Sequence, residues 1–434
     1  MESSGRIDCM RSFDRRMKTN LAESIKDTPE GKEANAILRA CVHCGFCTAT
    51  CPTYQLLGDE LDGPRGRIYL MKELLEGAPV TESTQLHLDR CLTCRACETT
   101  CPSGVKYGRL VDIGRAIVEK EVGRGPMQGL IRTALKTIIP RPSLFTPLLR
   151  LGQWVRPLLP SELRRKVPPR VHATPWPGPR HARRMLVLQG CVQPGIAPTI
   201  NPALARLLDA IGISLIAAEE AGCCGAVAYH LNAQDEGLRY MRRNIDAWWP
   251  YVEQGCEAIV MTASGCGVLV KEYGHLLRDD AGYAGKAAKI SALTKDASEI
   301  LTAESAALEG LLKQSRAAQT SGSVSRIAYH ASCTLQHGQQ ITGVVEPLLR
   351  LAGYELTYVP DGHLCCGSAG TYSLLQTDLS QRLLTNKTGA LESGGPDAIA
   401  TANIGCLAHI QSGTQVPVRH WVELLEERVK SEAA

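Results

Sequence analysis

The sequence predicts an α+β protein of several domains, in which a helical, cysteine-rich domain precedes two duplicated α/β domains. Three observations predict this architecture. Two cysteine runs of identical spacing lie near the N-terminus. A set of four cysteines occurs twice in the second half of the chain. Apolar runs lead into the cysteines of that set and alternate with segments of helical periodicity, which is typical of βα units and a parallel sheet.

Composition places the chain among ordinary soluble proteins, apart from its cysteines. It has 434 residues, of which 44% are hydrophobic and 21% charged, so two or three domains are expected. The first twenty residues are polar and have no apolar signal core, and no apolar run approaches the length of a membrane span. We therefore expect a reducing, cytoplasmic compartment, where the 18 cysteines bind metal or perform redox chemistry.

Changes in composition and motif predict five segments along the chain. They are an N-terminal lead-in (1–40), a helical domain with both cysteine runs (41–123), a basic, proline-rich linker (124–184) and two Cys-Cys-Gly domains (185–320 and 324–434). Within the helical domain, "RGRIYLMKELLEG" (65–77) has apolar residues at helical spacing and ends in a glycine, which predicts a helix and its stop.

The two N-terminal runs are "CVHCGFCTATCP" (41–52) and "CLTCRACETTCP" (91–102), each with Cys-x-x-Cys-x-x-Cys-x-x-x-Cys-Pro spacing. Three thiolates at this spacing wrap one corner of a four-iron cluster, and the fourth cysteine of each run ligates the other cluster. The spacing therefore predicts a ferredoxin-type domain with two [4Fe-4S] clusters. One cluster is held by Cys41, Cys44, Cys47 and Cys101, and the other by Cys91, Cys94, Cys97 and Cys51.

Structural zinc and disulfides are weaker interpretations of these runs. Zinc needs four ligands per site, and the third cysteine and the Cys-Pro of each run would then be surplus. Pro52 and Pro102 fix the backbone after the fourth cysteine, which favours the cluster interpretation. His43, inside the first run, is expected to be a hydrogen-bonded loop residue rather than a ligand.

The second half of the chain carries an internal duplication with an offset of about 142 residues. The gaps from Cys191 to Cys223 and from Cys333 to Cys365 are both 32 residues, and "AGCCGAV" matches "HLCCGSA". Each cysteine follows an apolar, β-rich run such as "RMLVLQGC" or "RIAYHASC", so we expect the cysteines beyond the carboxyl ends of parallel strands. One set is Cys191, Cys223, Cys224 and Cys266, and the other is Cys333, Cys365, Cys366 and Cys406.

Three interpretations of these eight cysteines remain open. They bind one or two further clusters, they are redox thiols or ligands of another metal, or they are buried structural cysteines. The adjacent pairs disfavour the last interpretation, because neighbouring residues do not easily pack into the same core. His330, His337 and His363 lie near the second set and are expected to form loop hydrogen bonds, with orientation of the thiolates as the alternative. Cys9 and Cys256 have no counterparts and are expected to play no part in ligation.

Residues 124–184 are strongly basic, with 13 of the 48 Lys and Arg residues and one acidic residue, Glu162. Short amphipathic pieces, "GLIRTALKTII" and "PLLRLGQWVRPLL", lie within this stretch. We expect a solvated linker with packed short helices, or a docking segment for a partner subunit or an anionic membrane surface. Nucleic acid is not an expected partner, because no binding motif accompanies the charge.

No motif for substrate chemistry accompanies the cysteines. The chain has neither Gly-x-Gly-x-x-Gly nor Gly-x-x-x-x-Gly-Lys-Ser/Thr, and no evident Ser/His/Asp or paired-carboxylate site. Two adjacent four-iron clusters form a short path for single electrons. We therefore expect an electron-carrying subunit whose partner binds a flavin and performs the substrate chemistry.

These motifs resemble the iron–sulfur subunits of bacterial glycolate oxidase (glycolate dehydrogenase). The resemblance runs from about residue 17 to the C-terminus and includes "ILRACVHCGFCTATCPTYQLLGDELDGPRGRIYLMKELLEG", "EEAGCCGAVAYHLNAQ", "DGHLCCGSAGTYSL" and "VRHWVELLE". It implies a complex in which flavin subunits, with FAD, oxidise glycolate to glyoxylate. The iron–sulfur subunit then relays electrons to a membrane quinone, at the cytoplasmic face of the inner membrane.

Two alternatives remain open. Either the partner oxidises another 2-hydroxyacid or glycerol 3-phosphate, or the chain is a thiol–disulfide reductase. The second alternative arises because the second half also resembles the Cys-Cys-Gly domains of heterodisulfide reductases. In that family the motif ends in Cys-x-x-Cys, whereas Leu269 and His409 stand at the last position of the two halves here. This departure weighs against the unusual clusters of that family.

Overall fold

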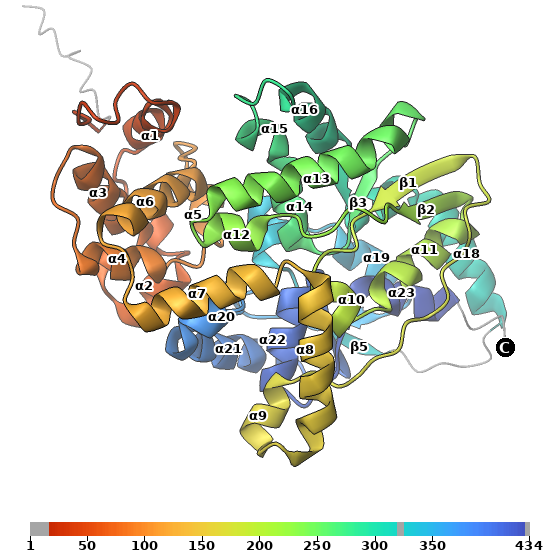
Figure 1. Cartoon of the computed structure of the whole chain (residues 1–434). Helices are drawn as coiled ribbons and strands as arrows, with labels where there is room; N and C mark the ends of the chain where they lie inside the picture. Colours follow the sequence, from red (N-terminus) through yellow and green to blue (C-terminus); the bar gives the residue numbers. More distant parts are fainter. Residues whose placement is uncertain (1–16, 319–324, 430–434) are drawn as a thin grey trace, which may run out of the picture. The chain divides into compact units, whose positions relative to one another are not determined.

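The computed structural model of the chain describes residues 17–318 and 325–429 (Figure 1). Their contacts divide the chain into two compact units. Unit 1 comprises residues 17–88 and 97–122, and unit 2 comprises residues 89–96, 123–318 and 325–429. Cys9 and the predicted junction at 320–324 lie outside the described residues.

Unit 1 is helical, as the sequence predicts. Its elements are α1 (Pro29–Ala40), η1 (Phe46–Thr48), α2 (Pro52–Leu57), η2 (Glu60–Asp62), α3 (Pro64–Leu75), α4 (Glu82–Asp89), α5 (Ala96–Thr99) and α6 (Tyr107–Glu121). Proline begins α1, α2 and α3, where its missing N–H has no helical partner in any case. α1, α3 and α6 contact one another, and Leu38, Met71 and Leu110 on these helices are fully buried.

The helical unit begins before the first cysteine run. α1 starts at Pro29, and the side chain of Thr28 caps it by accepting a hydrogen bond from the N–H of Gly31 at 3.0 Å. The same helix contributes the fully buried side chains of Ala34 and Leu38 to the interior. Part of the segment 1–40 therefore belongs to unit 1.

The basic segment 124–184 forms short helices, in unit 2. They are α7 (Pro126–Ile138), α8 (Pro142–Val155), η3 (Arg156–Leu158) and α9 (Ser161–Lys166), which include most of both predicted amphipathic pieces. No residue of α7 or α8 is fully buried. Among the helices that the structure describes, none is long and apolar enough to cross a bilayer.

Unit 2 contains two parallel four-stranded sheets, one from each half of the duplication. The first has the order β2-β1-β3-β4, from β1 (Arg183–Val187), β2 (Ile213–Ala217), β3 (Ile259–Met261) and β4 (Thr294–Asp296). The second has the order β6-β5-β7-β8, from β5 (Arg326–His330), β6 (Glu355–Leu356), β7 (Ala398–Thr401) and β8 (Val418–His420). All pairings are parallel, which confirms the predicted βα pattern. The short, partly polar strands β4 and β8 were not predicted by the apolar pattern.

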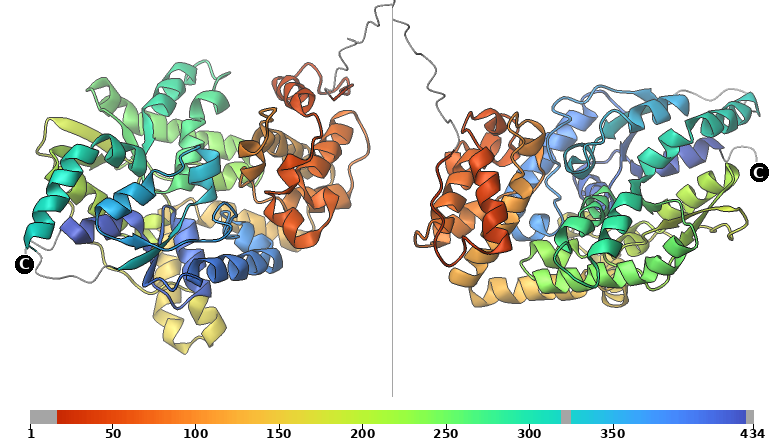
Figure 2. Two further views of the ribbon diagram at one scale, coloured as in Figure 1. Left: turned by 180° about the vertical axis from the view of Figure 1, so that it is seen from behind. Right: turned by 90° about the horizontal axis from the view of Figure 1, so that it is seen from above.

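Helices lie around both sheets, as Figure 2 shows from two further sides. Those of the first half are α10 (Gln193–Ile196), α11 (Ile200–Ala210), α12 (Ala226–His230), α13 (Gln234–Glu253), α14 (Ser264–Lys271), α15 (Tyr273–Leu276), α16 (Ala284–Leu293), α17 (Ala297–Ala303) and α18 (Ser305–Ala318). Those of the second half are η4 (Thr334–Gly338), α19 (Val345–Leu351), α20 (Tyr372–Leu375), α21 (Thr377–Glu392), α22 (Ile404–Gly413) and α23 (Trp421–Val429).

The two halves of unit 2 share one hydrophobic core. Leu204 of α11 and Trp421 and Leu425 of α23 are fully buried in the same cluster, and the two helices pack on each other. At the end of β8, Nε2 of His420 donates a hydrogen bond to the carbonyl oxygen of Thr262 in the first half, at 2.9 Å. The duplicated halves therefore share one core within unit 2.

Candidate metal centres

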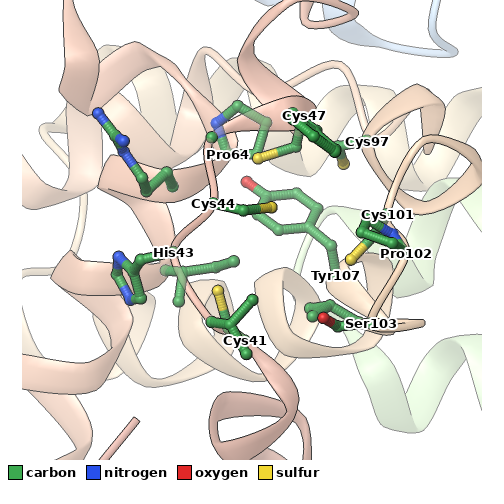
Figure 3. Close-up of a pocket in the computed structure, with 16 residues that line it drawn as sticks. Cys41, His43, Cys44, Cys47, Pro64, Cys97, Cys101, Pro102, Ser103 and Tyr107 are labelled. Carbon is green, nitrogen blue, oxygen red and sulfur yellow. The ribbon is translucent and has the colours of Figure 1, made fainter. Parts of the chain in front are cut away.

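Cysteines from both N-terminal runs meet at one cavity in unit 1 (Figure 3). Cys97 and the ring of Tyr107, at the start of α6, line this cavity, whereas Cys51 is not among its lining residues. Four of the lining residues form one predicted ligand set: Cys41, Cys44, Cys47 and Cys101. The fold thus brings the fourth cysteine of the second run to the first three cysteines of the first run.

The two cysteine loops have the same unusual backbone. His43 (φ +52°) and Gly45 (φ +84°) lie two and four residues after the first cysteine of one run, and Thr93 (φ +52°) and Arg95 (φ +60°) occupy the same positions in the other. Left-handed conformation is unfavourable for residues with a Cβ and is concentrated at functional sites. The same strained loop is therefore built twice, and His43 lies on the cavity wall.

Burial favours the protonated form of two thiols of the cavity, Cys41 and Cys47. Burial raises the pKa of Cys47 to about 11, with the nearby Cys41 thiol as the next cause. Burial is also the main cause that raises the pKa of Cys41. Thiolates, not thiols, bind metal, so loading of this cavity must release protons.

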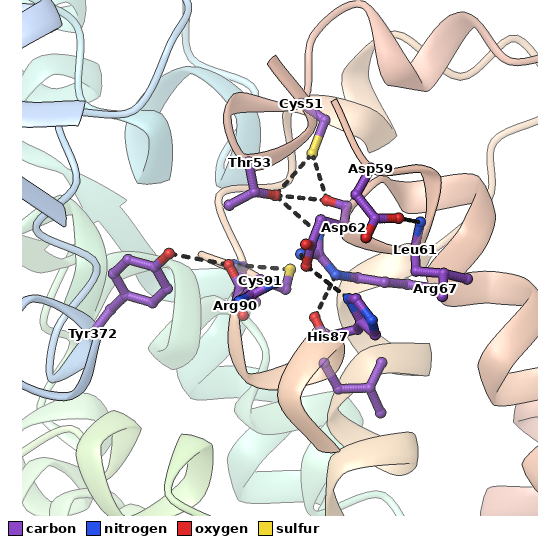
Figure 4. A network of polar contacts seen from close by, with 12 residues as sticks. Cys51, Thr53, Asp59, Leu61, Asp62, Arg67, His87, Arg90, Cys91 and Tyr372 are labelled. Carbon is purple, nitrogen blue, oxygen red and sulfur yellow. Dashed lines mark hydrogen bonds and ion pairs between the residues drawn. The ribbon is translucent and has the colours of Figure 1, made fainter. Parts of the chain in front are cut away.

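Cys51 is held by a buried polar network in unit 1 (Figure 4). Its Sγ lies 3.3 Å from Oγ1 of Thr53, which donates to the carbonyl oxygen of Asp62 at 2.8 Å. Arg67 donates to Thr53 at 3.1 Å, to the carbonyl oxygen of His87 at 2.7 Å and to the carboxylate of Asp62 at 3.3 Å. This buried ion pair therefore fixes the position of a predicted ligand through Thr53.

The loop that carries Cys91 and Cys94 belongs to unit 2, whereas Cys51 and Cys97 of the same predicted set belong to unit 1. Within unit 2 the loop is anchored on the cysteine-rich halves. Arg95 makes two hydrogen bonds to the carboxylate of Glu272, at 2.5 and 3.0 Å. Tyr372, from the second half, donates to the carbonyl oxygen of residue 90 at 3.1 Å (Figure 4).

The structure gathers each duplicated cysteine set at the carboxyl edge of its sheet. In the second half, the Sγ atoms of Cys333 and Cys365 are 3.8 Å apart. The pKa of Cys333 is raised by its contact with Cys365 and by burial, and more weakly by other thiols that include Cys94 of the second run. Contacts between thiols link the members of each set in one order along the chain, namely Cys191, Cys223, Cys224 and Cys266, and Cys333, Cys365, Cys366 and Cys406.

The last position of each Cys-Cys-Gly motif requires glycine, because of its backbone conformation and its close contact with another segment. Gly225 and Gly367 have φ of +98° and +91°. A Cβ on Gly225 would lie 2.8 Å from the carbonyl oxygen of Gly237, and one on Gly367 would lie 2.7 Å from that of Ser380. Only glycine fits such an approach in this conformation. The motif therefore lets the cysteine loop pack directly on α13 in the first half and on α21 in the second.

The pKa is lowered, which favours the thiolate, at one cysteine of the first set, Cys223, and at two of the second, Cys365 and Cys406. Contacts with the thiols of the neighbouring cysteines lower the pKa of Cys223 and of Cys365. In addition, the N–H of Gly225 donates to Sγ of Cys223, and the N–H of Gly367 donates to Sγ of Cys365, both at 3.4 Å. A thiolate among buried thiols is suited to metal ligation or to thiol redox chemistry.

Three other residues were singled out in the sequence. His337 and Cys256 have structural roles, whereas His330 lies beside a cysteine set. Nε2 of His337 donates to the carbonyl oxygen of His363 at 2.9 Å, so His337 has the expected loop role. Cys256 donates to the carbonyl oxygen of Ala258 at 3.2 Å and packs against the first half's core, so it has the structural role expected for it. His330, by contrast, is the last residue of β5 and lies among the thiols of the second set.

A helical unit with two interlocking cysteine runs, joined to a pair of cysteine-rich α/β halves, defines a class of iron–sulfur proteins. Comparison with known families supports this class. Residues 37–105 match the family described as a 4Fe-4S dicluster domain. Residues 185–271 and 327–411 each match the family described as a cysteine-rich domain.

Sequence comparison with individual relatives identifies the family within this class. The chain is 55% identical over 417 residues to the glycolate oxidase iron–sulfur subunit of Escherichia coli (strain K12), which covers 96% of this chain and 100% of the relative. It is 30% identical over 407 residues to the probable glycolate oxidase iron–sulfur subunit of Bacillus subtilis (strain 168), which covers 86% of this chain and 88% of the relative. Lactate utilization protein A of Bacillus licheniformis is 27% identical over 244 residues, which is 55% of this chain and 97% of the relative. The chain belongs to the family of glycolate oxidase iron–sulfur subunits.

Proposed function

We propose that this chain is the electron-transferring subunit of a flavin-dependent glycolate dehydrogenase complex, which oxidises glycolate to glyoxylate. The observation that carries the proposal is the cavity in unit 1, where Cys101 of the second run joins three cysteines of the first. Crossed ligation of this kind is the arrangement of two-cluster ferredoxins. The name of the Escherichia coli relative is the basis for glycolate as the substrate.

The proposed cofactors are two [4Fe-4S] clusters. The donor chemistry fits, because the eight cysteines provide two groups of four soft thiolate ligands. When bound, the clusters carry single electrons. The chain's own contribution is to hold and orient them: Thr53 fixes Cys51, and burial raises the pKa of Cys47, so this thiol must lose a proton when the cluster binds. The first cluster is assigned to Cys41, Cys44, Cys47 and Cys101, and the second to Cys91, Cys94, Cys97 and Cys51.

The flavin is assigned to partner subunits, as FAD. Oxidation of glycolate to glyoxylate releases two electrons and two protons, and a flavin accepts such a pair and releases the electrons singly. This chain has no nucleotide-binding glycine motif, which supports a role in the second stage only. The electrons then pass towards a quinone-type acceptor.

We also propose that α8 makes peripheral contact with the cytoplasmic face of the inner membrane. Leu144, Leu148 and Leu151 recur at helical spacing and are exposed, and Trp154 and Leu158 extend the same face with 80% and 86% exposure. Large apolar side chains on an exposed helix face, with a tryptophan near its end, are typical of interfacial helices.

Two further observations support membrane contact through the exposed apolar face of α8. One concerns the opposite face of this helix, and the other concerns the residues that follow it. Phe145 and Leu149 lie against Gly195 of α10, so the chain itself covers that side of the helix. A patch of exposed basic side chains follows the apolar face in sequence, consisting of Arg164, Arg165, Lys166 and Arg170. Such charge is complementary to anionic lipid headgroups.

The function is tested on the complex assembled from co-expressed subunits. With glycolate as donor and an artificial acceptor, the complex is expected to turn over, and Cys101→Ala is expected to abolish electron transfer past the flavin without preventing reduction of the flavin by glycolate. Preferential turnover of lactate or glycerol 3-phosphate would show that the substrate is wrong. Iron analysis of the anaerobically purified chain is expected to give at least about eight irons, because each cluster contains four.

The membrane contact is tested by sedimentation with vesicles of phosphatidylglycerol and phosphatidylcholine. The full chain is expected to bind anionic vesicles, and the double variant Trp154→Ser and Leu158→Ser is expected to lose most of this binding. Leu374→Ser is the matched control, because Leu374 is also exposed but lies on α20. Equal binding by all three proteins would exclude α8 as the contact surface.

A further inference from the structure

The second cysteine set contains a histidine that the first set lacks. His330 is the last residue of β5 and is 2% exposed. The position that corresponds to it in the first half is Leu188, which follows β1 and is 4% exposed. The two halves therefore share the four cysteines. They differ in the residue at the end of the first strand, which is a histidine in the second half and a leucine in the first.

The imidazole of His330 lies among thiols. One of its ring nitrogens and the Sγ atoms of Cys366 and Cys406 are all within 4.8 Å of one another, and all three residues are buried. Beside them, Nδ2 of Asn403 donates to Sγ of Cys406 at 3.5 Å. Cys333 and Cys365 complete the group, so four sulfur atoms and one imidazole converge at the edge of one sheet.

Nε2 of His330 has no hydrogen-bond partner among the residues that the structure describes. A buried polar atom without a partner is unfavourable, and native proteins rarely contain one without a functional reason. The other buried histidines of unit 2 differ in this respect, since Nε2 of His337 and of His420 both donate to carbonyl oxygens. The ring of His330 thus makes a hydrogen bond with the Cys406 thiol and still has one buried nitrogen without a partner beside the second set.

We propose that His330 is a nitrogen ligand of a metal centre in the second cysteine-rich half, which it shares with the thiolates of Cys366 and Cys406. Thiolate and imidazole together select iron in an iron–sulfur cluster or zinc, rather than magnesium or calcium. Cys333 and Cys365 supply the further sulfur ligands that either metal requires. This centre is additional to the two clusters proposed for the N-terminal cysteines and does not depend on which substrate the partner oxidises.

The first half is not expected to copy this centre. Leu188 offers no donor atom, and the guanidinium of Arg243 lies against the loop before Cys223, where it would meet a Cβ placed on Gly222 at 2.4 Å. A cationic side chain beside the thiols favours thiolate formation but adds no ligand. The duplication has therefore produced two different sites from one cysteine pattern.

The test uses the full chain, labelled with ¹⁵N-histidine and purified anaerobically. Iron and zinc are measured per chain, and the nitrogen coupling of any paramagnetic centre is measured by pulsed EPR. The wild-type protein is expected to hold metal beyond the eight irons of the ferredoxin-type clusters, with a coupling from histidine nitrogen. If the additional metal is zinc, X-ray absorption at the zinc edge reports the imidazole instead.

Three variants separate ligation from folding. His330→Leu, which copies the first half, is expected to lose the additional metal and to keep eight irons. His330→Cys is expected to keep the metal and to lose the histidine signal. His337→Gln, the control, is expected to change neither quantity. The proposal is overturned if the wild-type protein holds no metal beyond eight irons, or if His330→Leu keeps the additional metal with an unchanged spectrum. Fewer than eight irons in the wild-type protein would instead count against the ferredoxin-type clusters.

Discussion

The Sγ atoms of Cys333 and Cys365 lie 3.8 Å apart, although 32 residues separate the two cysteines in the chain. The contact exists because Cys333 follows β5 and Cys365 follows β6, and these strands are parallel neighbours in one sheet. Neighbouring parallel strands end at the same edge, so the residues beyond them meet. The first half repeats the relationship between Cys191 and Cys223, which follow β1 and β2.

Crossed ligation of the ferredoxin-type clusters predicts the iron content of two double variants. If Cys44 and Cys101 serve one cluster, the variant with both replaced by alanine is expected to keep about four of eight irons. If Cys94 and Cys101 serve different clusters, replacing both is expected to leave almost none of the eight irons of these two clusters. Self-contained runs predict the reverse result for the two proteins. Iron analysis of anaerobically purified protein distinguishes these outcomes.

The glycine of the second Cys-Cys-Gly motif is predicted to be sensitive to a single added methyl group. Gly367→Ala is expected to destabilise the chain by about 2–5 kcal/mol, because it combines left-handed strain with a collision at the carbonyl oxygen of Ser380. Gly212→Ala is the control, since Gly212 has φ of +84° but no atom within 4 Å of an added Cβ. Its expected cost is about 1–2 kcal/mol, for strain alone. Equal losses in denaturant unfolding would show that the close approach is unimportant.

The buried ion pair of Arg67 and Asp62, next to Cys51, is predicted to contribute far more to the free energy of unfolding than an exposed ion pair. Arg67→Ala removes the guanidinium from the buried carboxylate of Asp62 and leaves Nδ1 of His87, at 3.1 Å, as a neighbour, and the expected loss is about 3–5 kcal/mol. Arg65→Ala removes a half-exposed pair with Glu60, and the expected loss is below about 1 kcal/mol. Thermal unfolding of both proteins measures the contrast. A small effect of Arg67→Ala would mean that Asp62 is otherwise satisfied.

The junction between the cysteine-rich halves is predicted to weaken in acid. Burial lowers the pKa of His420 to about 4, and Glu423 only partly opposes this effect. The neutral ring suits its site, because Nε2 donates to the carbonyl oxygen of Thr262 while Nδ1 accepts from the N–H of Val422 at 3.3 Å. Since the folded pKa lies below the ordinary value of 6.5, this contribution is complete above pH 6.5 and is lost as pH falls through about 4.

The size of that loss is about 3 kcal/mol, because each pKa unit corresponds to about 1.36 kcal/mol. His420→Gln removes the titration and is the comparison protein. The difference in unfolding free energy between wild type and variant is expected to shrink between pH 7 and pH 4, as measured by denaturant titration. A difference that is constant with pH would show that His420 is already protonated in the folded protein or is not buried in solution.

Much of this architecture follows from the sequence, because its signals are local. Spacing of two residues between cysteines constrains the first three cysteines of each N-terminal run to one small site. The alternation of β-rich and helical runs predicts that the sheets are parallel. The 32-residue gap before each Cys-Cys-Gly predicts that the two halves have the same topology, which the strand orders confirm. The strands β4 and β8 were not predicted, because a strand of only three residues with mixed polarity shows too little alternation of apolar and polar side chains.

The sequence by itself therefore determined the cysteine pattern, the duplication and the family to which the chain belongs. Only the tertiary structure decided that the two halves share one core, that α8 leaves one apolar face uncovered, and that Nε2 of His330 is buried without a partner. The physical reason is that spacing along the chain is set by covalent geometry. Burial and hydrogen bonding, however, depend on which distant side chains pack against a residue. The sequence around a histidine at a strand end therefore does not tell whether its ring lies against a carbonyl oxygen or, as in His330, beside the sulfur atoms of Cys366 and Cys406.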